Sequence, residues 1–170
     1  MAVARPRQGF VLIVTSIALT LLLALAGLGI DIGRMYVIRA ELQSFTDAAA
    51  LSAALELNGT DAGLARARAG AARWTTGPGA MRWNMGTEPI TNVTTSFAQG
   101  AGSPDGETPN DQSWRERPAE GAGYRFVRVV ASEPAPVIFL RLFQPLGISS
   151  TAVAAASVAE KSDQAVRLIQ

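Results

Sequence analysis

The sequence predicts an α+β protein: a long N-terminal helix, half transmembrane and half amphipathic, then a short helix and a small antiparallel sheet. Three observations support this fold class. Residues 9–30 form an uncharged apolar run, a helical apolar stripe continues this run to about residue 57, and segments rich in β-branched residues follow only later. Helices that precede strands, instead of alternating with them, are typical of α+β domains.

The apolar run at residues 9–30 is long enough to cross a membrane. A hydrocarbon core of about 30 Å needs roughly 20 helical residues. The alternative is a buried core helix, but a helix that is apolar on every side over about six turns would be unusual in a globular chain of 170 residues. We therefore expect a transmembrane helix, with the lipid bilayer as its partner.

The flanks of this run predict its orientation. Arg5 and Arg7 precede it, and short basic flanks tend to stay in the cytoplasm. We expect a single-pass protein of a bacterial inner membrane, with residues 1–8 cytoplasmic and residues 31–159 forming an extracytoplasmic domain. The alternative is a signal peptide cleaved after Ala26, which would release a secreted or periplasmic binding module. The run exceeds the usual signal-peptide apolar region of about 7–15 residues, which favours a retained anchor.

The helix is expected to continue beyond the membrane, because residues 31–57 contain no proline. Asn58-Gly59 is a typical helix stop. Apolar side chains recur three and four residues apart, which indicates an amphipathic helix, at Ile32, Met35, Ile38, Leu42, Phe45, Ala49 and Ala53.

A second helix is predicted from Thr60 or Asp61 to about Trp74, where the sequence TTGPG breaks it. The predicted strands are 88–98, 124–132 and 148–159. The remaining segments are predicted as a long loop at 99–122, a short amphipathic helix at 137–147 and a polar tail at 160–170.

The composition argues against catalysis. The chain has no cysteine and no histidine, which excludes the usual zinc sites, Ser-His-Asp triads and acid–base catalysis by histidine. The net charge of +1 is unlike that of a nucleic-acid binder with its concentrated basic face. We therefore predict no enzyme, no catalytic, cofactor-binding or metal-binding residue, no cofactor, no nucleic-acid partner and no small-molecule substrate.

The segment from residue 27 to 55, GLGIDIGRMYVIRAELQSFTDAAALSAAL, carries a specific pattern. An apolar helix is followed by Asp-x-Gly-Arg, then Leu-Gln, then Asp-Ala-Ala-Ala-Leu. This pattern resembles the N-terminal signature of the TadG-like and TadE-like proteins of Tad (tight adherence) pilus assembly. The signature residues are Asp31, Gly33, Arg34, Leu42, Gln43, Asp47, Ala48, Ala49, Ala50 and Leu51.

The resemblance implies a pilin-like fold and a function. It implies a membrane-anchored structural or assembly component of a Flp/Tad-type pilus or secretion apparatus. Such a component acts by helix packing and protein–protein contacts with other Tad/Flp components or pilin-like subunits.

Two groups of residues are candidates for helix packing or partner contact. Gly29 and Gly33 either form a small-xxx-small face that allows close approach of another helix or reflect the general frequency of glycine in membrane helices. Asp31 and Arg34 form either a docking pair or a plain juxtamembrane ion pair. The second group packs against another subunit or against the protein's own sheet, and it comprises Leu42, Gln43, Asp47, Ala48, Ala49 and Leu51.

Overall fold

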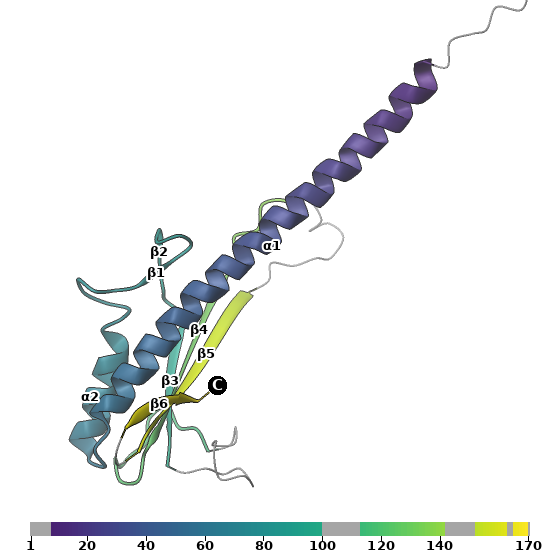
Figure 1. Ribbon diagram of the computed structural model, residues 1–170. Helices are drawn as coiled ribbons and strands as arrows, with labels where there is room; N and C mark the ends of the chain where they lie inside the picture. Colours follow the sequence, from purple (N-terminus) through teal and green to yellow (C-terminus); the bar gives the residue numbers. More distant parts are fainter. Residues whose placement is uncertain (1–7, 100–112, 142–151, 163–164, 170) are drawn as a thin grey trace, which may run out of the picture.

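The computed structural model describes residues 8–99, 113–141, 152–162 and 165–169. Helix α1 (Gln8–Glu56) is followed by helix α2 (Asp61–Ala72), and the strands come afterwards (Figure 1). The predicted α+β fold is confirmed. The strands are β1 (Arg82–Trp83), β2 (Glu88–Pro89), β3 (Val93–Ala98), β4 (Phe126–Pro134), β5 (Ala152–Lys161) and β6 (Val166–Ile169).

Helix α1 has two halves with different surroundings. It contains 49 residues, so at about 1.5 Å per residue it is roughly 70 Å long. Its N-terminal half, exposed from residue 9 to 26, extends away from the rest of the molecule, whereas the second half lies along the sheet (Figure 1). Most of the predicted apolar stripe is buried, with Ile38, Leu42 and Phe45 at most 1% exposed, but its first member, Ile32, is 40% exposed.

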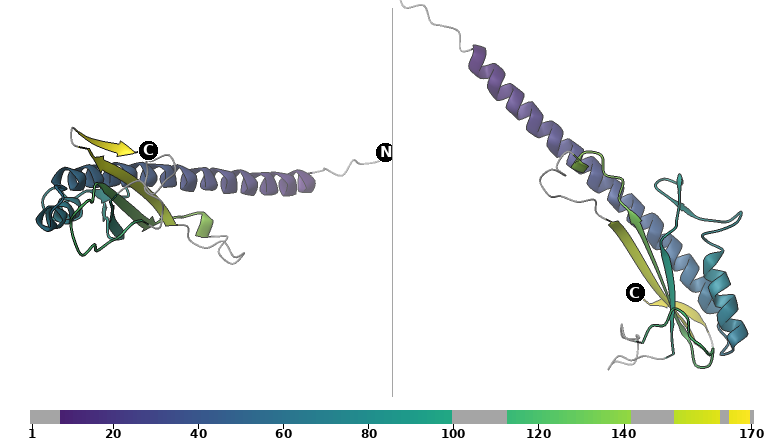
Figure 2. Two further views of the ribbon diagram at one scale, coloured as in Figure 1. Left: turned by 90° about the horizontal axis from the view of Figure 1, so that it is seen from below. Right: turned by 180° about the vertical axis from the view of Figure 1, so that it is seen from behind.

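Strands β3, β4, β5 and β6 form an antiparallel sheet in that order. Side chains alternate between its two faces, and Val127, Val129 and Ala131 of β4 point into the core. Helix α1 lies across one face of this sheet (Figure 2). The small side chains of Ala49 and Ala53, both fully buried, allow the helix to approach the strands closely.

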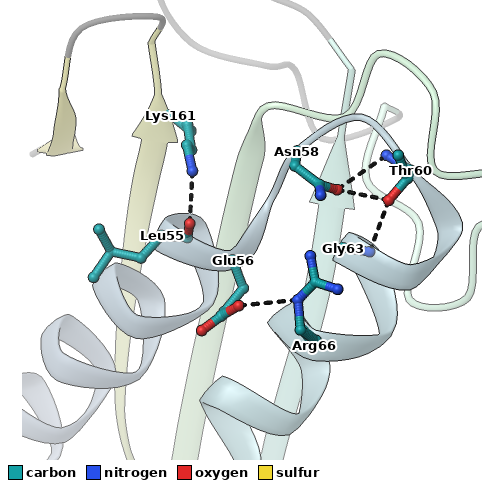
Figure 3. Close-up of polar contacts among 7 residues, drawn as sticks. All are labelled: Leu55, Glu56, Asn58, Thr60, Gly63, Arg66 and Lys161. Carbon is teal, nitrogen blue, oxygen red and sulfur yellow. Dashed lines mark hydrogen bonds and ion pairs between the residues drawn. The ribbon is translucent and has the colours of Figure 1, made fainter.

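The turn between the two helices is fixed by side-chain capping. The Thr60 hydroxyl accepts a hydrogen bond from the Gly63 N–H at 3.0 Å, which makes Thr60 the N-cap of α2 (Figure 3). The Asn58 side-chain oxygen accepts bonds from the Thr60 N–H at 3.2 Å and from the Thr60 hydroxyl at 2.7 Å. Gly59 between them has a φ of 74°, a conformation that glycine adopts without strain. The predicted stop of α1 at Asn58-Gly59 follows from this geometry.

The C-terminal end of α1 is tied to both α2 and the sheet. Lys161 at the end of β5 donates from Nζ to the Leu55 carbonyl at 2.6 Å (Figure 3). A cation there is favourable, because the last carbonyls of a helix carry partial negative charge. Arg66 of α2 pairs with Glu56 at 3.2 Å. Both of these side chains are largely exposed, so this ion pair contributes little to stability.

Gly70 allows α2 to lie against α1. A Cβ at this position would lie 3.1 Å from the Ser52 carbonyl oxygen. We expect Gly70→Leu to lower the free energy of unfolding by about 1–3 kcal/mol, because the larger side chain forces the helices apart. Urea unfolding followed by tryptophan fluorescence measures this loss. Ala69→Leu on the exposed side of α2 is the matched control, and an equal loss in both variants would contradict close packing at Gly70.

The predicted strand at 88–98 is divided in the structure. Pro89, which has no N–H to donate, ends β2, and β3 begins only at Val93. Between them the buried Glu133 carboxylate accepts the Thr91 N–H at 2.6 Å and the Asn92 N–H at 3.0 Å, so these donors bond to a side chain instead of a strand. The sequence reading also missed β1, which pairs with β2 in a small hairpin.

The C-terminal part differs from expectation in two further places. The segment predicted as a polar tail from residue 160 includes the end of β5 and strand β6, whose Val166 and Leu168 pack against the core. Of the helix predicted at 137–147, the described part is a bend that ends in one short turn at 140–141. The remaining residues 142–147 lie outside the described residues, as do 148–151 of the last predicted strand and 100–112 of the predicted long loop.

Candidate functional site

Asp31 lies on α1 just after the apolar half, and its side chain is only 1% exposed. Its carboxylate accepts three backbone hydrogen bonds from a segment more than 100 residues further along the chain. Oδ1 accepts the Ile138 N–H at 3.0 Å, while Oδ2 accepts the Phe139 N–H at 2.9 Å and the Leu140 N–H at 2.7 Å. Hydrogen bonds to an ionised group are among the strongest in proteins, so Asp31 fixes this segment on the helix.

We call the segment Val137–Arg141 the docking turn. Its second point of contact is Gly27, one helical turn before Asp31. The ring of Phe139 lies directly over Gly27, and a Cβ at this position would be 2.4 Å from ring atoms Cγ and Cδ1. A contact below 3 Å cannot be accommodated without movement, so the absence of a side chain at Gly27 allows the docking turn to lie where Asp31 holds it.

The ionisation of Asp31 is shifted by this environment. Burial raises the pKa of the Asp31 carboxyl, whereas the N–H groups of Leu140, Ile138 and Phe139 and the positive charge of Arg34 lower it. The net effect is a pKa below the ordinary value of 3.8. Asp31 is therefore ionised in the folded protein at neutral pH.

A pH dependence follows from the direction of this shift. A folded-state pKa below the unfolded value means that ionised Asp31 stabilises the fold above about pH 4. This contribution is lost as the pH falls through the unfolded value and then through the lower folded value. We expect the urea midpoint to decrease from pH 5 to pH 2.5 more steeply for the native sequence than for Asp31→Asn. Parallel pH profiles for the two proteins would contradict this role of Asp31.

A second cluster of signature residues joins α1 to β5. Gln43 donates from Nε2 to Asp47 Oδ1 and to the Ser157 hydroxyl, both at 2.9 Å. The Ser157 hydroxyl also donates to Asp47 Oδ1 and lies 2.7 Å from the Thr46 hydroxyl. These polar groups therefore bond within the protein and set the register of α1 against the sheet.

The small hairpin is held by two further side chains of α1. Arg34 donates from Nη2 to Asn84 Oδ1 at 3.0 Å, and Glu41 Oε1 accepts the Met85 N–H at 2.9 Å. Asn84 and Met85 both have positive φ, 55° and 59°, an uncommon conformation for residues other than glycine. The contacts with α1 hold this turn in place.

The residues predicted as candidates for helix packing or partner contact therefore fall into two groups, according to their position on α1. Leu42 and Ala49 are fully buried against the protein's own sheet, and Ala48 and Leu51 are half-buried. In contrast, Gly29 and Gly33 lie on a side of the helix where a Cβ would meet none of the described residues within 4 Å. We call this side of α1 the open side.

The sequence analysis did not single out Gly27 or Ser157, and it predicted the docking turn only as part of a helix at 137–147. Gly27 precedes Asp31 by four residues, the spacing that places two residues on the same face of a helix, so this spacing was the available signal. Ser157 and the docking turn gave no such signal, because they act through a single hydroxyl and through backbone N–H groups.

Residues 9–56 match the Tad family, "Putative Flp pilus-assembly TadE/G-like". The resemblance stated from the sequence is thus confirmed over this Tad segment, which coincides with α1 to within one residue of its start. No curated protein and no solved structure shows a significant match to the chain.

The Tad segment contains both structural halves of α1. Its apolar half is long and apolar enough to cross a membrane and is almost entirely exposed, while its second half carries the clusters around Asp31 and Asp47. Together, the family match and the apolar helix fit a component of pilus assembly that is associated with a membrane. They suggest a structural or assembly role, in contact with other pilus components, rather than catalysis.

Proposed function

We propose that this protein is a membrane-anchored structural or assembly component of a Flp/Tad-type pilus or secretion apparatus. Residues 9–30 cross the bacterial inner membrane once, with the N-terminus in the cytoplasm and the folded domain outside. The observation that carries the proposal is the match of residues 9–56 to the Tad family. Its support in the structure is the exposure of large apolar side chains along this half of α1, such as Leu22 at 64% and Leu25 at 66%.

The two sides of α1 have different roles in this proposal. One side is committed to the protein's own domain through Asp31 and Leu42. The opposite side presents Gly29 and Gly33, which permit another helix backbone to approach closely within or near the membrane. Tyr36 continues this side with 72% of its surface exposed. A second helix from a pilus component fits along this open side.

Crosslinking tests this function directly. A photoreactive group at Tyr36 should capture other envelope proteins of the assembly apparatus when membranes from the source cells are irradiated and solubilised. Gly33→Leu should reduce this capture at least fivefold without changing the urea midpoint, because a Cβ there has no neighbour within 4 Å among the residues that the structure describes. Gly9→Leu, at another open position of α1, is the matched control. Recovery of the protein alone, without envelope partners, would contradict the proposal.

The mass of the mature protein distinguishes this proposal from the alternative, a binding module released by cleavage. A retained anchor leaves the full chain of 17.8 kDa, apart from any change before residue 9. Cleavage after Ala26 would remove the apolar half of α1, and with it the segment on which membrane anchoring depends.

A further inference from the structure

We propose that the docking turn, Val137–Arg141, is a second membrane contact that inserts Ile138 into the outer leaflet of the bilayer. The proposal rests on the membrane placement of residues 9–30 given under the proposed function. The partner surface is phospholipid at the boundary between acyl chains and head groups.

The first argument is depth. The docking turn contacts α1 at Gly27 and Asp31, and Gly27 lies three residues before the end of the apolar run. At about 1.5 Å per residue this places Phe139 roughly 4–5 Å inside the end of the anchor. The turn lies against α1 beyond the end of the sheet, toward the N-terminal half of the helix (Figure 2). A bilayer that covers residues 9–30 therefore reaches the docking turn.

The second argument is the chemistry of the turn. Ile138 is 54% exposed. On α1, Leu28 and Ile30, which neighbour the contact residues Gly27 and Asp31 in sequence, are also exposed, at 38% and 52%. Arg141 follows and is exposed. A long basic side chain beside an apolar tip can keep its charge among the head groups while the apolar part enters the acyl region.

The third argument concerns backbone polarity. Lipid does not accept hydrogen bonds, so an irregular segment with free N–H groups is excluded from it. In the docking turn, the N–H groups of Ile138, Phe139 and Leu140 are all bonded to the Asp31 carboxylate. The same three bonds that fix the turn on α1 also satisfy the donors that would otherwise oppose its contact with lipid.

Fluorescence quenching in vesicles tests this contact. The sequence has no cysteine, so the variants Leu21→Cys, Ile138→Cys and Leu55→Cys each give one labelling site in the full chain. Each is labelled with an environment-sensitive nitrobenzoxadiazole dye and reconstituted in phosphatidylcholine vesicles that contain 5-doxyl lipid. Leu21 reports insertion of the anchor. Leu55, with 60% of its surface exposed, lies about 37 Å beyond residue 30 on α1 and is the matched control for an exposed apolar site.

We expect the dye at Ile138 to be quenched at least threefold more than the dye at Leu55, with emission shifted to the blue. Unchanged urea midpoints verify that the labelled variants remain folded. Quenching at Leu21 together with equal, weak quenching at Ile138 and Leu55 would overturn the lipid contact and leave the anchor intact. Absence of quenching at Leu21 would overturn both the contact and the membrane placement in the proposed function.

Discussion

Replacement of Asp31 by alanine is expected to destabilise the folded domain by about 3 kcal/mol or more. The substitution removes a buried acceptor and leaves the N–H groups of Ile138, Phe139 and Leu140 without their bonds. A buried polar group left unpaired costs about 1–3 kcal/mol, and bonds to charged groups are worth more than neutral ones. Urea unfolding of the full chain in detergent, followed by tryptophan fluorescence, measures the loss.

The control for Asp31 is Asp47→Ala. Asp47 is only half-buried and bonds to the side chains of Gln43, which is exposed, and of Ser157, whose hydroxyl keeps Gln43 and Thr46 as partners. We expect a loss of about 1 kcal/mol for this variant. If Asp31→Ala stays within about 0.5 kcal/mol of the native protein, a range ordinary for surface substitutions, Asp31 does not hold the docking turn.

Replacement of Gly27 by leucine is expected to release the docking turn from α1. The first carbon of the new side chain already overlaps the Phe139 ring at 2.4 Å, so the ring must leave its site. Overpacking of this kind costs about 1–3 kcal/mol. Release of the turn also exposes to water the hydrogen bonds that its N–H groups donate to the Asp31 carboxylate. The protection of the Phe139 amide against hydrogen exchange should therefore fall at least tenfold.

Gly29→Leu provides the control on the same helix, because a Cβ there lies more than 4 Å from every residue in the described part of the chain. In the Gly29→Leu variant, the amides of the docking turn should be protected against hydrogen exchange as strongly as in the native protein. The double variant Gly27→Ala with Phe139→Ala adds a second test, since removal of the ring removes the two overlaps at 2.4 Å and leaves only the contact with Cβ of residue 139 at 2.9 Å. Equal effects of Gly27→Leu and Gly29→Leu would show that the two glycines do not differ in packing.

Much of the helix was predictable from the sequence because its signals are periodic. The spacing of Ile38, Leu42 and Phe45 identified the buried side of α1, and the structure confirms that all three are buried. Asn58-Gly59 predicted where the helix stops. Short elements gave weaker signals: β6 has only four residues, one of them charged, and β1 and β2 have two each.

The role of Asp31 was less accessible to sequence reading. Its spacing from Arg34 suggested a pair between the two side chains, yet the carboxylate bonds to backbone N–H groups of the docking turn. Backbone N–H donors are present at every residue except proline. The amino-acid identities of Ile138, Phe139 and Leu140 therefore do not indicate that they are partners of an aspartate. Only the path of the chain brings these groups together.

The contacts of Asp31 also have a consequence for the order in which the protein matures. The aspartate and its first donor are 107 positions apart, and contacts between such distant positions form late, because a large loop must close before they are gained. During synthesis from the N-terminus, α1 emerges while its carboxylate still faces water. The contact between Asp31 and the docking turn therefore forms late, after most of the polypeptide has been synthesised.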